Sequence, residues 1–244
     1  MKVELSYMNP IRYVISNEIF ARFPSYLRGC VVATDLKNGT SPEELTLLLR
    51  SAEEAVRQRL TLEQVTSEPR LNSWREAFRA VGMKPADFRP SVEGLVRRAL
   101  HGQELPSINA LVDIGNIISL RHLLPVGGHA IDELNEDMNL RMASGEEEFI
   151  PFGSDQMEHP EKGEIILAAG NTVLTRRWIW RQANFTLTLP ETTAMVFNLD
   201  AMPPIYEAEL ESIANELMEL IRKFCGGKLE YTVLKKDQPA IPLK

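Results

Sequence analysis

The chain has 244 residues, of which 44% are hydrophobic and 25% are charged, as expected for a soluble globular protein with a sizeable core. Its formal net charge of −7 argues against a general-purpose nucleic-acid binder. No apolar run approaches the ~20 residues that cross a bilayer, and residues 1–6 lack the apolar core of a secretory leader. Cys30 and Cys225 cannot form a disulfide framework or a metal cluster by spacing. We therefore expect a cytoplasmic protein with no membrane partner.

The charge is unevenly distributed along the chain. Residues 70–101 carry seven basic and three acidic side chains, and Arg97 and Arg98 belong to this basic segment. Residues 132–164 carry eleven acidic and two basic side chains. Such polarity allows one face to meet phosphates, although two solvated faces of opposite sign explain it as simply.

In chain order, hydrophobic periodicity predicts two short strands followed by four helices: strands over 12–15 and 29–34, and helices over 41–60, 71–81, 91–100 and 108–123. Ser41, Pro42 and Glu44 have the spacing of an N-cap, a first helical proline and a capping box. Gly82 is placed to end the helix before it.

After residue 125 the pattern changes to strand-length pieces separated by turn residues: 138–143, 164–169, 172–180, 186–189 and 193–199. A last amphipathic helix begins at Pro203-Pro204 and ends at Gly226-Gly227, and a short strand spans 229–234. This order favours an α+β fold with antiparallel or mixed sheets over a doubly wound parallel fold. We expect residues 1–244 to form a single compact domain.

The helix predicted over 108–123 carries an unusual polar row. Asn109, Asp113 and Asn116 are spaced by four and three residues, which places them on one side of a helix. Burying amides and a carboxylate costs free energy unless each finds a partner. The row therefore either braces a neighbouring loop or lines a site.

Several common site motifs are absent from the sequence, which contains no phosphate-binding glycine loop, no CxxC and no HExxH. The four histidines lack metal-ligand spacing, so we expect neither a metal nor another cofactor. A tight turn explains Gly127-Gly128. His129 follows that turn, and such a histidine is more often structural, but imidazole could also orient a water or an ester carbonyl.

Residues 176–182 read Arg-Arg-Trp-Ile-Trp-Arg-Gln. As a strand, this segment would place Arg177 and Arg181 on one face, and Trp178 and Gln182 on the other. Arginines beside indoles suit phosphate contact and base stacking. Equally, the tryptophans could fill the core while the arginines pair with the acidic segment.

Taken together, these motifs resemble a known family. The runs 108–116, 125–128 and 131–134 and Gly145-Glu146 resemble the editing domain of the bacterial phenylalanyl-tRNA synthetase β subunit. The similarity is greatest to free-standing copies of that domain and covers roughly residues 70–200. It implies a three-layer α+β sandwich and a pocket for the aminoacyl end of tRNA, where the synthetase hydrolyses mischarged tyrosine.

The chain departs from the synthetase pattern at sites that bear on the substrate. Asn116 matches the synthetase asparagine, but Gly127 stands where the family has a histidine, with His129 two residues later. The region 181–185 lacks the family's glutamate, and Gln182 or Asn184 would hydrogen-bond a ligand instead. A changed substrate is implied.

These observations lead to three hypotheses. The first is a tRNA-binding protein, not a full synthetase, that hydrolyses mischarged aminoacyl-tRNA in trans; Asn116 and His129 would orient substrate or water, and amides near Gly127-Gly128 would stabilise the oxyanion. In the second, a non-catalytic module holds an RNA end or an amino-acid-like ligand. In the third, the polar helix is internal bracing of a subunit-interaction protein.

The predicted ligand-binding residues are Asn109, Asp113, Gly127, Gly128, Gln182 and Asn184, and those for RNA are Arg177, Trp178, Arg181, Arg97 and Arg98. The oligomeric state stays open.

Overall fold

The computed structural model describes residues 10–243; residues 1–9, on which the expectation of no secretory leader rests, and residue 244 lie outside the described part. The elements in chain order are β1 (Arg12–Ile15), α1 (Asn17–Arg22), β2 (Leu27–Thr34), α2 (Glu43–Arg59), α3 (Pro69–Ala80), α4 (Ser91–Leu100), α5 (Ala110–His122), β3 (Val126–Ala130), β4 (Met138–Met142), β5 (Ile165–Ala169), β6 (Thr172–Arg176), β7 (Arg181–Gln182), β8 (Met195–Ala201), α6 (Glu207–Phe224), β9 (Lys228–Leu234) and β10 (Ala240–Pro242).

The strands form two sheets. The first sheet has the order β10-β1-β4-β5-β6-β7 and is mixed, because β1 and β4 pair in parallel while its other neighbours are antiparallel. The second has the order β3-β8-β2-β9 and is antiparallel throughout. Strand β3 is thus an edge strand, and one side of its backbone is free to face a cavity.

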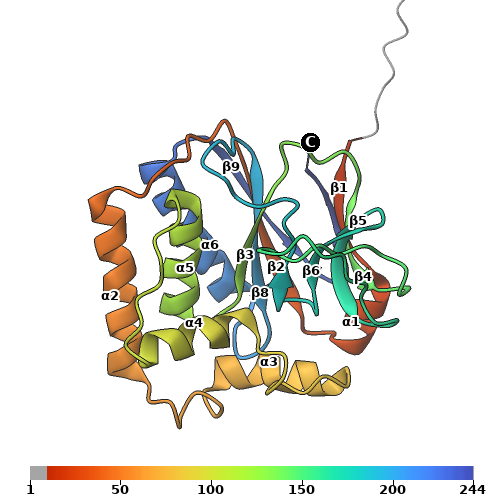
Figure 1. Ribbon diagram of the computed structural model, residues 1–244, viewed down its shortest axis with the longest axis horizontal. Coiled ribbons are helices and arrows are strands. Elements are labelled where there is room, and N and C mark those ends of the chain that lie inside the picture. Colours follow the sequence, from red (N-terminus) through yellow and green to blue (C-terminus); the bar gives the residue numbers. More distant parts are fainter. Residues whose placement is uncertain (1–9, 244) are drawn as a thin grey trace, which may run out of the picture.

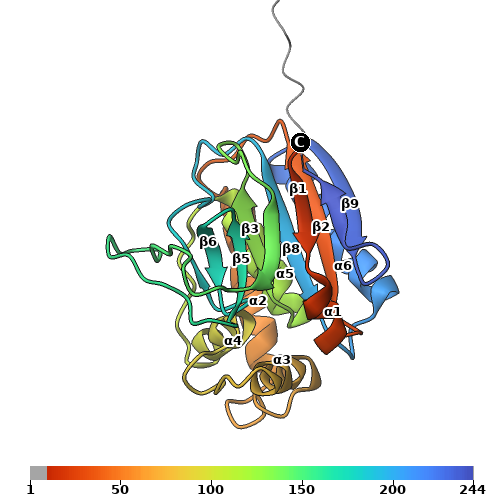
Figure 2. The same ribbon diagram turned by 90° about the vertical axis from the view of Figure 1, so that its right-hand side faces the viewer.

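The elements are stacked in three layers (Figures 1 and 2). Helices α5 and α6 cover one face of the four-stranded sheet, with α2 packed against α5, and the six-stranded sheet covers the other face. Alternation along β2 and β8 explains this arrangement: Val31 and Phe197 point into the core shared with the helices, whereas Cys30 and Val196 point into the core between the sheets. The predicted α+β three-layer sandwich in a single compact domain is confirmed.

Helix starts were predicted less well than the helices themselves. Helix α2 begins at Glu43, and its N-cap position makes no side-chain cap. The predicted cap at Ser41 is wrong, because the Ser41 hydroxyl donates to Asp113 Oδ2 at 2.6 Å. Helix α5 begins at Ala110 rather than at residue 108, since Asn109 is its N-cap.

Several strand predictions were also wrong. The segment 172–180 does not continue as one strand, because β6 ends at Arg176 and a turn follows. Residues 186–189 form no strand. Gly127-Gly128 is not a turn: both glycines lie inside β3, paired with Asn198 and Phe197 of β8. The short helix α1 was not predicted.

Candidate functional site

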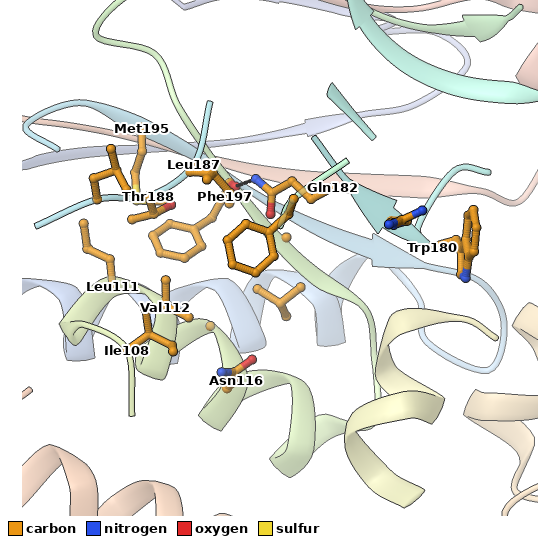
Figure 3. Close-up of a pocket in the computed structure, with 17 residues that line it drawn as sticks. Ile108, Leu111, Val112, Asn116, Trp180, Gln182, Leu187, Thr188, Met195 and Phe197 are labelled. Carbon is orange, nitrogen blue, oxygen red and sulfur yellow. Dashed lines mark hydrogen bonds between the residues drawn. The ribbon is translucent and has the colours of Figure 1, made fainter. Parts of the chain in front are cut away.

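A mostly apolar cavity, which we name the main cavity, lies where α5 faces the edge of the four-stranded sheet (Figure 3). Its volume is about 470 Å³, within the range of small-molecule sites. The helix contributes one wall, β3 and β8 the floor, and the segments 180–182 and 187–189 the opposite side. Most of the lining is apolar, and the polar side chains are few: Asn116, Arg181, Gln182 and Thr188.

Asn116 and Gln182 face this cavity from opposite sides (Figure 3). Asn116 is half-buried on α5. Gln182 belongs to β7, and its Nε2 donates to the Gly128 carbonyl at 3.0 Å. Arg181 also lines the cavity. The structure thus places Asn116, one residue of the polar row, across this cavity from Trp180, Arg181 and Gln182.

The two glycines of β3 present opposite faces of the strand to different spaces. A Cβ at Gly128 would meet Met195 Cε at 2.5 Å and Phe197 at 3.6 Å, on the helix side. A Cβ at Gly127 would meet nothing within 4 Å. Asp200 N donates to Pro125 O, and Ile131 N donates to Ala194 O, so the odd-numbered residues of β3 direct their backbone groups toward β8. Because these directions alternate along an antiparallel strand, the Gly128 N–H points away from β8.

A second, inner cavity of about 130 Å³ lies on the other side of β3, between the sheets. It shares five lining residues with the main cavity, namely Val126, Gly127, Trp180, Arg181 and Gln182. Its wall is polar because successive side chains of β8 point to opposite faces of the sheet. Asn198 and Asp200 point toward the six-stranded sheet, while Phe197 points toward the helices.

His129 lies in the wall of this inner cavity rather than at the main one. Its Nδ1 is 2.9 Å from Thr186 Oγ1, and its Nε2 is 3.2 Å from Thr175 Oγ1. Burial, assisted by the charge of Arg28, lowers the pKa of His129 to about 3. The imidazole is therefore neutral at physiological pH, and both of its nitrogens are engaged by threonine hydroxyls.

Arg28 forms the centre of a buried polar cluster that the sequence analysis missed. Its guanidinium pairs with Asp200 at 2.7 Å and donates to the Tyr13 hydroxyl. Tyr26 donates to the same carboxylate at 2.5 Å, and burial raises the pKa values of both tyrosines. The one local signal was the placement of Asn198 and Asp200, two residues apart, in an apolar strand.

The first two members of the polar row on α5 do not reach the main cavity. Asn109 accepts from Val112 N at 3.1 Å and donates to the Thr188 carbonyl at 2.8 Å. Asp113 is fully buried. It accepts from Ser41 Oγ and Ser107 Oγ, and from the backbone N–H of Ile108. Both side chains brace loops, so within the row the cavity receives only Asn116.

Residues 177–180 form a turn, and its first two residues have left-handed backbones, with φ of 49° at Arg177 and 69° at Trp178. Trp178 is buried in an aromatic cluster with Tyr26 and Trp74. Arg177 stacks on Phe88 and pairs with Glu161 at 2.9 Å. For Trp178 and Arg177, the structure therefore agrees with the alternative in which the tryptophans of this segment fill the core and its arginines pair with the acidic segment.

The remaining predicted RNA contacts are dispersed. Arg181 lines the main cavity and pairs with Glu158 at 3.2 Å, with a side chain that is 39% exposed. Arg97 pairs with Glu93 at 2.8 Å, and Arg98 donates to the Glu104 carbonyl at 3.2 Å; neither lines the cavity. Asn184 is exposed and belongs to a different hollow, beside Thr186.

Within residues 10–243, no group of three His, Cys, Asp or Glu side chains is arranged to hold a metal ion. A search of the same residues for a helix with the length and apolarity of a membrane span found none.

Fold and cavity define an α+β domain with a small-molecule-sized pocket at a sheet edge. Residues 73–226 match the family model described as the B3/4 domain, which is well over half of the chain. The chain therefore belongs to the B3/4 domain family. This agrees with the coarse part of the sequence resemblance, a domain like that of the phenylalanyl-tRNA synthetase β subunit.

No curated protein matches the sequence. Among solved structures, the chain is similar to an N-terminal fragment of the phenylalanyl-tRNA synthetase β-subunit from Pyrococcus horikoshii, with 11% sequence identity and a TM-score of 0.45. The alignment covers 94% of this chain and 52% of the fragment, so the chain spans about half the length of that structure.

Proposed function

We propose that this protein is a tRNA-associated binding module whose main cavity holds an amino-acid-like group, such as the aminoacyl end of a tRNA. The observation that carries the proposal is the cavity itself. An apolar space of about 470 Å³ has Asn116 on one wall and Gln182 and Arg181 on the other. Such a site accommodates an apolar body and orients it through a few hydrogen bonds.

The charge distribution favours contact with the end of an RNA over contact along its length. Arg181 is the cationic side chain in the cavity wall, and it is partly neutralised by Glu158. Arg177 is buried in ion pairs. We therefore expect weak salt dependence, corresponding to about one or two phosphate contacts.

Hydrolysis of the bound ester is the second candidate function, and the free edge of β3 favours it. The outward amide of Gly128 lies in the cavity wall, where an N–H can stabilise an oxyanion. Asn116 lies across the cavity and could position water. None of the side chains that line the main cavity is a carboxylate, histidine, serine or cysteine, so catalysis would depend on positioning instead of a general base.

The test is a panel of correctly charged and mischarged tRNAs and uncharged tRNA, measured for binding and for deacylation. The binding proposal expects an aminoacyl-tRNA to bind more tightly than the same tRNA uncharged, and Asn116→Ala to remove that difference. Equal affinity for charged and uncharged tRNA would overturn it. Deacylation above the uncatalysed rate, reduced in Asn116→Ala, would establish the second candidate.

The role of the edge amide can be tested separately. Gly128→Pro removes this N–H without breaking a bond to β8, as proline is tolerated at sheet edges. Gly128→Ala introduces the same contact with Met195 but keeps the N–H. If the amide stabilises an oxyanion, deacylation falls about 100-fold in Gly128→Pro relative to Gly128→Ala. Equal rates would exclude that role.

A further inference from the structure

The inner cavity contains a buried hydrogen-bonding group that the protein leaves unused. Asn198 is 3% exposed and lines this cavity, yet its Oδ1 has no hydrogen-bond partner among the described residues. Native proteins seldom leave a buried amide oxygen unpaired, because its desolvation is then uncompensated. An occupant that donates a hydrogen bond would satisfy it.

Space for such an occupant lies directly beside this side chain. Gly127 pairs with Asn198 in the sheet, so both residues project to the same face. A Cβ at Gly127 would meet nothing within 4 Å, although the neighbouring Gly128 is closely packed. Gly127 and Gln182 line both cavities, so the inner space adjoins the main one.

The buried charged groups of the inner cavity and its histidine are already engaged. His129 is held by two threonine hydroxyls, and Arg28 is neutralised by Asp200. The indole N–H of Trp178 lacks a well-aligned partner, but it lies beside the Tyr26 hydroxyl. Asn198 Oδ1 is therefore a buried acceptor in the described part of this cavity that remains available to a ligand.

The surrounding charges restrict what can enter. A carboxylate has no proton to donate to Asn198 Oδ1, and it would lie near the Asp200 carboxylate. An ammonium group would lie near Arg28, whose charge already disfavours protonation of His129. A neutral donor, either a hydroxyl or a carboxamide, meets neither obstacle, and about 130 Å³ accommodates a few heavy atoms.

We infer that the inner cavity is a specificity subsite, in which Asn198 accepts a hydrogen bond from the uncharged polar end of a ligand whose apolar part occupies the main cavity. This inference rests on the proposed function, because it assigns a second part of the same ligand. The subsite would select ligands whose side chain is uncharged and can donate a hydrogen bond.

The experiment uses amino acid amides as probes, measured by calorimetry or ligand-observed NMR with the full chain. Matched sets are threonine and valine amides, glutamine and glutamate amides, and tyrosine and phenylalanine amides. In at least one set, the neutral donor binds about 10-fold more tightly than its partner. Asn198→Leu, which is similar in size, removes that preference and leaves binding of the apolar probes unchanged.

Gly127→Leu supplies an independent check, since its side chain would project into the inner cavity. By filling the inner cavity, the leucine side chain should remove the preference for the neutral donor. Thermal unfolding of both variants verifies folding; Asn198→Leu should not be destabilised, because it replaces an unpaired polar group with an apolar one.

The possible failures are distinguishable. If apolar probes bind but no set shows a preference for the neutral donor, or if the preference survives Asn198→Leu, the subsite inference is wrong while the proposed function stands. If no amide and no aminoacyl-tRNA binds, the proposed function fails and the subsite inference fails with it.

Discussion

The two ends of the polar row on α5 behave differently although their residues are chemically alike. At the beginning of the helix, Asn109 and Asp113 are buried and make five hydrogen bonds, to Val112, Thr188, Ser41, Ser107 and Ile108. Two turns after Asn109 and three residues after Asp113, Asn116 is half-buried and lines the main cavity. One helical face thus fixes loops at one end and offers a hydrogen-bonding group to a ligand at the other.

The difference arises from what lies opposite each residue. The loop before α2 supplies Ser41 to the beginning of α5, and Thr188 reaches it from the segment before β8. Opposite Asn116, the wall is formed by Gln182 and apolar side chains at a distance that leaves a cavity. Substitutions at the beginning of this helix should therefore lower stability, and substitution of Asn116 should lower ligand binding.

Substitution of Asp113 should have the largest effect on stability. Asp113→Ala leaves Ser41, Ser107 and the Ile108 N–H without their buried acceptor, so we expect the free energy of unfolding to fall by about 3 kcal/mol. Urea unfolding measures it, with Asn116→Ala as the control from the same helix face. A loss below about 1 kcal/mol would contradict the bracing role of this carboxylate.

His129 extends the comparison to a second fully engaged polar group. Its pKa is about 3 in the folded protein and about 6.5 in an unfolded chain. Only the unfolded chain takes up this proton between these pH values, so the free energy of unfolding falls as the pH is lowered through this window. By pH 5 the loss from this residue is about 2 kcal/mol.

Urea unfolding at pH 7 and pH 5 measures this loss in the wild type and in His129→Gln. The difference between the two pH values should be smaller in His129→Gln by about 2 kcal/mol. His101→Gln is the matched control, because His101 is exposed. An unchanged pH dependence in His129→Gln would show that this imidazole titrates normally.

Local patterns predicted helices α2 to α6 and most strands, because what determines these elements lies within each segment. The apolar periodicity of α5 and α6 corresponds to the face that each buries against the four-stranded sheet, and that of α2 to the face it buries against α5. Where a residue far away in the chain determines the local conformation, the predictions were wrong. The turn after β6 forms around Glu164, which accepts from the Arg177 N–H at 3.0 Å, and Gly127-Gly128 becomes a strand because β8 pairs with it.

The same distinction applies to the candidate site. Spacing along α5 singled out Asn109, Asp113 and Asn116 together, of which Asn116 lines the main cavity. Composition singled out residues 176–182, of which 180–182 line it. The inner cavity was missed because Arg28 and Asp200 are 172 positions apart in the chain. Nothing in either segment alone indicates that they meet, or that Asn198 Oδ1 beside them has no hydrogen-bond partner among residues 10–243.

Asn109 should have an intermediate effect on stability. Asn109→Ala removes both the N-cap of α5 and the bond to the Thr188 carbonyl, so we expect a loss of about 1.5 kcal/mol. Asn109→Asp keeps an acceptor for Val112 N but cannot donate to Thr188. Urea unfolding should rank Asn109→Asp between the wild type and Asn109→Ala; equal losses would mean that the bond to Thr188 supplies the whole contribution.

Asn116 should show the smallest change in stability and the largest change in binding. Asn116→Ala removes a half-buried amide from a cavity wall, and alanine favours the helix, so unfolding should change by less than about 0.5 kcal/mol. Affinity for an aminoacyl-tRNA should fall about 10-fold, equivalent to ~1.4 kcal/mol. Asn109→Ala is the matched control, with the opposite pattern expected. If Asn116→Ala unfolds as easily as Asn109→Ala but binds normally, the whole row is bracing and the ligand contacts lie elsewhere in the cavity.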